Sequence, residues 1–284
     1  MPWGAFLDGA PFDKNCTYDF SRPISLVIKN DEKSQDYKIF VHSFTGLPVM
    51  WIETEERTEI TSKEDYLLAH MLLREDLARN GESSTLEADL KIKGRGNSTW
   101  VQPKKTYRLK FNEKISFFGE KEDKSWVLLA NYLDHTMIRN ATAFFIGSMS
   151  NLEWISRSHF VELMLNGRYN GTYQLTEKIK IGKNRVDAGD DGFLLEVDNK
   201  LNAGEICFTT PNLPNPVRIH EPEVEVGDSN YQYIESYVNE MEQPLFSDFF
   251  MDANKGYRKY IDIDSFVEWY VIGEITENST NLAN

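Results

Sequence analysis

The stretch from Lys91 to Lys110 (KIKGRGNSTWVQPKKTYRLK) combines a strand pattern with a local excess of positive charge. It holds seven Lys and Arg residues and no carboxylate, in a chain whose formal net charge is −14. Basic residues alternate with apolar residues or glycine on both sides of a turn, and this period of two is typical of half-buried strands. We therefore expect a hairpin that holds an anion, since acidic residues would serve solubility equally well. The alternative is two exposed strands whose basic ends are solvated.

The two faces of the second strand differ in character. A lysine in register with buried apolar side chains needs an acid or a phosphate beside it, because an unpaired buried charge is costly. Before this strand, the glycines of the turn let backbone amides point at a ligand. One face is expected to carry Lys105, Tyr107, Leu109 and Phe111, and the other Lys104, Thr106, Arg108 and Lys110.

Length and composition exclude several classes of protein. A chain of 284 residues with 40% hydrophobic content can bury a core without disulfides, as one large domain or two lobes. The pI near 4.9 argues against nucleic acid as a partner, whereas one basic island suits a small anion. No apolar run reaches the roughly 18 residues of a transmembrane helix, and the residues after Met1 do not form a signal peptide. Cys16 and Cys207 could pair or remain thiols, and their spacing does not decide between these states.

Strand patterns dominate the first two thirds of the chain. Alternation predicts strands over Ile24–Thr61 and Lys124–Asn131, and a hairpin over His159–Lys180 that turns at Asn166-Gly167. A further strand is expected over Phe193–Asp198. Asp65–Asn80 follows a capping-box pattern and has leucines at helical spacing, although the same residues could lead into an edge strand.

Helical patterns follow in the last part of the chain. Helices are predicted over Met137–Ser150, Asn230–Phe250 and Asp264–Asn278, and the last is apolar nearly all round, which is typical of a core helix. Four prolines between residues 211 and 222 indicate a linker. The predicted organisation is lead-in strands over 1–46, a strand-rich lobe over 47–210, a linker over 211–229 and the start of a helical lobe over 230–284; nucleotide binding by the lobe over 47–210 is what the family resemblance given below implies.

The standard hydrolase and metal motifs are missing, and the five histidines are scattered. What exceeds chance is an ordered set of segments, none of which is specific alone. In chain order the set comprises Arg95–Trp100, Pro103–Lys110, Trp126–Asn131, Ile138–Asn140, Val161–Gly167, Tyr169–Tyr173, Leu175–Lys178 and Phe193–Asp198. With this set, the chain resembles the spore-coat protein H (CotH) kinase family and, more closely, its relatives in Bacteroidetes-type bacteria, over roughly Leu47–Asn278.

The resemblance implies an α+β, divergent protein-kinase-like two-lobed fold, with a strand-rich first lobe and an incomplete helical second lobe. It also implies binding of ATP with magnesium and phosphorylation of Ser or Thr on secreted or coat proteins, hence a cell-surface or secreted location. Lys105 and Glu177 would form the lysine–glutamate pair of a kinase, with Asn278 as a metal ligand. The nucleotide-binding residues implied are Arg95, Asn97, Lys104, Lys105 and Arg108.

Two departures from the family concern catalysis. Thr280 stands where relatives carry the aspartate that looks like the catalytic base, and threonine cannot accept a proton near neutral pH as a carboxylate can. Relatives also continue into an acidic–aromatic metal motif beyond the equivalent of Asn284. The two main alternatives are therefore an active kinase, or a non-catalytic pseudokinase that serves as a surface module contacting protein or glycan. A carbohydrate-active or adhesin domain, whose strand-rich opening would be a β-sandwich, is a weaker third alternative. The substrate and the oligomeric state stay open.

Overall fold

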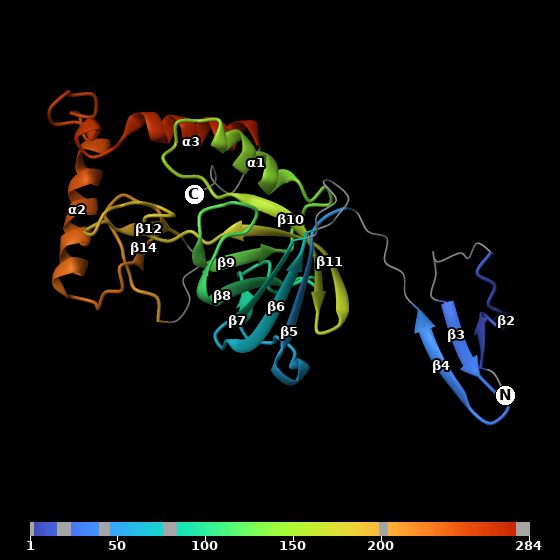
Figure 1. Cartoon of the computed structure of the whole chain (residues 1–284). Coiled ribbons are helices and arrows are strands. Elements are labelled where there is room, and N and C mark those ends of the chain that lie inside the picture. The colour runs from blue at the N-terminus through green and yellow to red at the C-terminus, as the bar shows by residue number, and fades with distance from the viewer. Residues whose placement is uncertain (1–2, 16–23, 40–45, 76–83, 199–203, 277–284) are drawn as a thin grey trace. The chain divides into compact units, whose positions relative to one another are not determined.

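The computed structural model describes residues 3–15, 24–39, 46–75, 84–198 and 204–276. The chain divides into two compact units, Met1–Leu47 and Pro48–Asn284. The first unit is an antiparallel sheet in the order β2-β1-β3-β4 (Figure 1). Its strands are β1 (Gly4–Leu7), β2 (Ala10–Pro11), β3 (Ile24–Lys29) and β4 (Ser34–Ile39).

The second unit is built on a closed seven-stranded barrel in the order β10-β11-β9-β8-β7-β6-β5 (Figure 1). All neighbouring strands are antiparallel except β10 and β5, which close the barrel in parallel. The chain is thus an α+β protein, rich in strands and with few helices among the described residues. The barrel strands are β5 (Val49–Thr54), β6 (Leu67–Arg74), β7 (Thr85–Arg95), β8 (Thr106–Ile115), β9 (Asp123–Leu129), β10 (Ser158–Leu165) and β11 (Arg168–Glu177).

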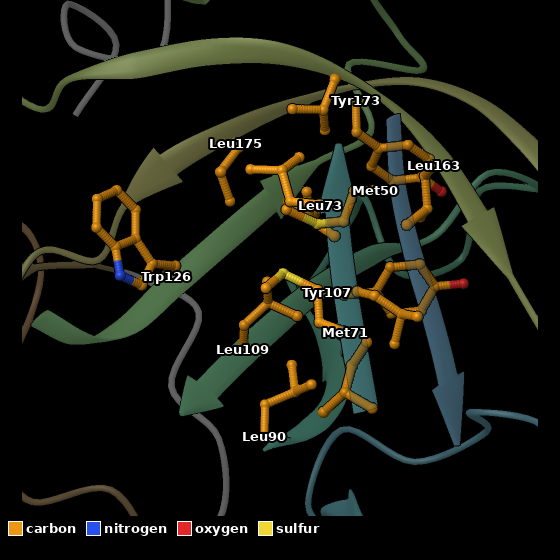
Figure 2. Close-up of a cluster of buried hydrophobic side chains, with 14 of the residues drawn as sticks. Met50, Met71, Leu73, Leu90, Tyr107, Leu109, Trp126, Leu163, Tyr173 and Leu175 are labelled. Atoms are coloured by element: carbon orange, nitrogen blue, oxygen red, sulfur yellow. The ribbon is translucent and has the colours of Figure 1, made fainter. Parts of the chain in front are cut away.

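Alternate residues of each strand fill the barrel interior, so the barrel is a packed core and not a pore. Figure 2 shows side chains from different strands converging there, with Trp126 and Tyr173 among the largest fully buried ones. The Phe117 ring meets Trp126 edge-on, with centroids 4.9 Å apart. The alternation predicted for the second basic strand is confirmed, because Tyr107, Leu109 and Phe111 are all buried.

The helix predicted over Asp65–Asn80 is wrong for its described part. Leu67–Arg74 is strand β6, which lies between β5 and β7 and is therefore not an edge strand either. Apolar residues on both faces hide the period of two: Ala69 and Met71 are buried inside the barrel, whereas Leu68 lies outside and is 48% exposed. The capping-box pattern instead forms a turn, in which the Ser62 hydroxyl accepts hydrogen bonds from the backbone amides of Glu64 and Asp65. Residues 76–83 lie outside the described part of the chain.

The hairpin at Asn166-Gly167 is confirmed. β10 and β11 pair along their length, and both turn residues have positive φ, 50° at Asn166 and 76° at Gly167. Asparagine and glycine are the residues that tolerate this left-handed conformation best. The Asn166 Oδ1 atom also accepts a hydrogen bond from the Thr54 amide at 2.9 Å, which ties the turn to the end of β5.

Gly94 is required for close packing on β7. A Cβ atom at this position would lie 2.2 Å from Cζ3 of Trp100, whose ring folds back over the strand. We expect Gly94→Ala to lower the free energy of unfolding by about 1–3 kcal/mol through overpacking, as measured by urea denaturation. Adding Trp100→Ala should make the Gly94→Ala change nearly neutral in a double-mutant cycle. An unchanged stability in Gly94→Ala alone would contradict this packing.

The rest of the second unit holds a small sheet and the helices (Figure 1). The sheet has the order β12-β14-β13, and α2 packs its buried Ile234 and Val238 against it. Short 3-10 helices lie at Glu55–Arg57 and Tyr257–Lys259. The other elements are α1 (Arg139–Ser148), β12 (Leu194–Val197), β13 (Cys207–Phe208), β14 (Val217–Glu221), α2 (Ser229–Leu245) and α3 (Ile263–Ile275).

Two predictions about this region need correction. The linker expected over 211–229 contains β14, because Val217 and Ile219 alternate with polar residues and fill the space under α2, while the prolines only flank the strand. The core helix expected near the end is α3, whose position is confirmed but whose side chains are mostly exposed. Among the described residues it packs beside α1, and only Gly273 of α3 is buried.

Cys207 carries a free thiol in β13, and Cys16 lies outside the described residues. Within the described part of the chain, we find no helix that combines the length and the apolar character needed to cross a membrane.

Candidate anion-binding cleft

A basic cleft of about 420 Å³ lies against the outer surface of the barrel. Its walls come from β8, from the start of β9, from the segment that follows β11, and from the last residue of β14. Six of the ten lining residues are basic and two are acidic, although the chain as a whole is strongly acidic. The lining residues are Arg108, Lys110, Lys114, Asp123, Lys124, Ser125, Lys178, Lys180, Ile181 and Glu221.

The strands beside this cleft place like charges directly opposite each other. On the outward faces of β7 and β8, Lys91 is paired with Lys110, and Lys93 with Arg108. Like charges opposed across an antiparallel pair are destabilising. Two such pairs make this part of the surface locally positive in an otherwise acidic protein.

Arg108 lies at the centre of the positive charge. Its Nε atom is buried and, among the described residues, has no hydrogen-bond partner. Burial lowers the pKa of Lys178, and repulsion by Arg108 lowers it further, whereas Glu221 acts in the opposite direction. Burial and repulsion by Arg108 likewise lower the pKa of Lys93, whereas Glu64 and Asp65 act in the opposite direction. At both lysines the nearby acids do not offset burial together with the charge of Arg108.

The two acids of the cleft are each held by a lysine. Asp123 lies 3.2 Å from Nζ of Lys180 and also accepts a hydrogen bond from the Ser125 amide at 2.7 Å. Glu221 lies 3.5 Å from Nζ of Lys178 and accepts a hydrogen bond from the Ile181 amide at 2.8 Å. Of the other four basic side chains, Lys114 lies 3.9 Å from Glu122 at the edge of the cleft, and Arg108, Lys110 and Lys124 have no acid partner within the lining.

The two lysines predicted to meet the phosphates lie elsewhere, near the turn that precedes β8. The Lys105 ammonium donates to the Trp100 carbonyl at 2.7 Å and lies 5.2 Å from the centroid of the Trp100 ring. The Lys104 ammonium donates to the Thr172 carbonyl and lies 4.4 Å from the Tyr173 ring centroid. Burial lowers the pKa of Lys104. Neither lysine lines the cleft.

Glu177 has a different partner from the predicted lysine. Its Oε1 atom lies 2.8 Å from Nη1 of Arg185, and its Oε2 atom accepts a hydrogen bond from the Arg157 amide at 3.0 Å. Arg185 in turn covers the Trp126 ring, 4.9 Å from its centroid. Burial raises the pKa of Glu177, while the Arg157 amide and Arg185 act against that rise. Since both side chains are almost fully buried, this pair is part of the barrel's packing.

Of the residues implied by the family resemblance, the structure brings Arg108 to the cleft. Arg95 lies further along β7, opposite Thr106, and Asn97 is an exposed turn residue. Asn278 and Thr280 lie outside the described residues. The sequence reasoning missed Lys178, Lys180 and Glu221, although Lys178 belongs to one of the family-like segments and Lys180 follows it at strand spacing.

No metal centre is formed within the described ranges, where no group of three or more His, Cys, Asp or Glu side chains is placed to hold an ion. The chemistry that the cleft offers is the binding and orientation of an anion. Arginine offers a planar fork and lysine a point charge, and both are the usual partners of phosphate oxygens.

Comparison with known proteins adds the family. No curated protein matches the sequence. The sequence model of the family described as CotH kinase protein matches residues 92–282, more than half of the 284 residues. The match begins in β7 and spans every element that lines the basic cleft. The chain therefore belongs to the CotH kinase protein family.

Proposed function

We propose that this chain is a kinase-like domain that binds ATP with its triphosphate in the basic cleft. The observation that carries the proposal is the cluster of six basic side chains, two of which face like charges across the β7–β8 pair. In this proposal the barrel serves as the strand-rich lobe, and the helices after β14 begin the second lobe of a divergent protein-kinase-like fold.

The cleft would contribute to phosphoryl transfer by positioning and by neutralising charge, which are the main catalytic effects in this reaction. Arg108 would hold phosphate oxygens through its guanidinium, whose buried Nε has no hydrogen-bond partner within the described ranges. Lys178 and Lys180 would neutralise charge from the opposite wall. The acceptor would be a Ser or Thr hydroxyl of a secreted or coat protein, and the domain would act at the cell surface or after secretion.

Magnesium bridges the phosphates of ATP in kinases generally. Asn278 is the ligand proposed for it, and this residue lies outside the described part of the chain. What the described residues would contribute to the mechanism is holding and orienting the triphosphate.

The second candidate is a pseudokinase that binds the nucleotide without transferring phosphate. It is favoured by Thr280, which cannot act as the proton-accepting base near neutral pH. The same chain could then serve as a surface module that binds protein or glycan.

Calorimetric titration with ATP, with magnesium and with EDTA, tests the proposal, followed by transfer of labelled phosphate to coat-type protein substrates. We expect saturable binding that weakens as salt is raised, because screening acts on this charge attraction. Binding with transfer would identify a kinase, and binding without transfer a pseudokinase. An absence of ATP binding under both conditions would contradict both.

A further inference from the structure

Glu221 places a carboxylate inside the basic cleft in a manner that resembles a bound anion. It extends from the end of β14, and its two partners, Lys178 and Ile181, follow strand β11 of the barrel. The carboxylate is thus held by one ammonium, at 3.5 Å, and by one backbone amide, at 2.8 Å. An ammonium and a backbone N–H group that converge on one oxygen-bearing group are a typical arrangement for holding phosphate.

The surroundings of this carboxylate favour its exchange for a stronger anion. The Lys178 and Glu221 side chains keep 25% and 29% of their exposure, so a ligand can reach the lysine and the displaced carboxylate can turn into solvent. Arg108 adds a third positive charge beside Lys178 and Lys180, while the cleft lining supplies two carboxylates, Glu221 and Asp123. A phosphate group carries more negative charge than a carboxylate and offers more acceptor oxygens.

The other acid of the cleft differs from Glu221 in this respect. Asp123 is only 7% exposed, and its Oδ1 atom is fixed by the Ser125 amide within its own strand. Asp123 therefore stays anchored within β9 even if its contact with Lys180 is lost. Glu221 is more exposed, with 29% of its side chain accessible against 11% for Asp123, and a ligand can replace both of its contacts.

We propose that Nζ of Lys178 and the amide N–H of Ile181 form a subsite for a phosphate group of a polyphosphate ligand, and that Glu221 occupies this subsite when the ligand is absent. Glu221 is then an internal competitor that sets the affinity of the cleft. Ligand binding exchanges a contact with β14 for a contact with the ligand. The inference rests on that part of the proposed function that places a polyphosphate in this cleft.

Titration with inorganic tripolyphosphate by calorimetry tests the proposal, with Glu221→Gln compared with the unaltered chain. Removing the competing charge should tighten the binding of tripolyphosphate. The gain should be modest, roughly 3- to 10-fold, because solvent screens the partly exposed Lys178–Glu221 pair. The matched control is Glu122→Gln, which removes the same charge from an exposed carboxylate 3.9 Å from Lys114 at the edge of the cleft. The control should change the affinity by less than about 2-fold. Weaker or unchanged binding by Glu221→Gln would overturn the proposal.

A second measurement needs no substitution and holds even if Glu221→Gln does not fold. In the ¹H–¹⁵N spectrum of the unaltered chain, the Ile181 amide resonance should shift saturably with tripolyphosphate, with the same Kd as in calorimetry. An Ile181 resonance that does not move while tripolyphosphate binds would overturn the subsite. Tripolyphosphate binding without ATP binding or phosphate transfer would support the subsite and contradict the proposed function. ATP binding whose affinity is unchanged by Glu221→Gln would support the proposed function and contradict the subsite.

Discussion

Replacing Arg185 with methionine is expected to lower the free energy of unfolding by about 3–5 kcal/mol. Arg185 and Glu177 form a buried ion pair 2.8 Å apart, with 0% and 3% of their side chains exposed. Removal of the arginine leaves a carboxylate buried at the end of the barrel without its counter-charge. Chemical denaturation measures the loss, and a loss below about 1 kcal/mol would contradict the assignment of this pair to the core.

Two further variants distinguish the effect of breaking the buried pair from the effect of losing any arginine. Arg57 and Glu53 form a similar pair at 3.2 Å, but 66% and 53% of their side chains are exposed, so Arg57→Met should cost less than about 1 kcal/mol. The double variant Arg185→Met with Glu177→Leu should recover much of the stability, since well-packed apolar residues can replace a buried pair.

The pH dependence of Arg185→Met follows from the same pair. Burial already raises the pKa of Glu177, and Arg185 opposes that rise. Without Arg185 the folded-state pKa rises further above the unfolded value of ~4.3. The protonated folded form is then favoured, so the stability deficit should be smallest below the unfolded pKa and grow as pH rises through the folded-state pKa. A deficit that shrinks with rising pH would show that Glu177 is not the group left unpaired.

Replacing Arg108 with glutamine is expected to weaken ATP binding by about 10- to 100-fold. One charge-assisted hydrogen bond contributes about 1.5–3 kcal/mol, and the loss of that energy corresponds to this range of affinities. Arg108 lines the cleft, and its buried Nε has no hydrogen-bond partner among the described residues. Calorimetry on a folded variant measures the change.

The Lys105→Gln variant distinguishes the cleft seen in the structure from the phosphate site predicted from the sequence. The sequence hypothesis makes Lys105 a phosphate contact, so that its loss should abolish binding. In the structure its ammonium is bound to the Trp100 carbonyl, outside the cleft lining, so we expect an affinity within about 3-fold of the original. If Lys105→Gln abolished binding and Arg108→Gln did not, the cleft would be the wrong site.

The local strand structure follows from the sequence where alternation is clean. The Asn166-Gly167 hairpin and the inward face of β8 were accessible this way, because each depends on residues near one another in the chain. The closure of the barrel depends instead on a parallel pairing of β10 with β5, whose partners are more than a hundred residues apart. Nothing in local periodicity encodes that pairing. Strand β6 was missed for a different reason: its outward face also carries leucines, which hide the period of two.

The sequence predicts that the candidate site is positively charged, but it does not predict which residues form it. The excess of basic residues on β7 and β8 is visible in the sequence, and Arg108 belongs to it. The opposite wall depends on where Lys178, Lys180 and Glu221 arrive through tertiary packing. The partner of Glu177 could not be read from the sequence either, because Arg185 approaches it from a separate loop.

The most direct test of the polyphosphate cleft is lysine footprinting by acetylation and mass spectrometry, with and without saturating ATP. The account predicts strong protection of Lys178, Lys180 and Lys110 by the nucleotide. Lys121, which is exposed and is not one of the lining residues, should react equally in both states. Equal labelling of the three cleft lysines with and without bound ATP, or protection confined to Lys104 and Lys105, would contradict it.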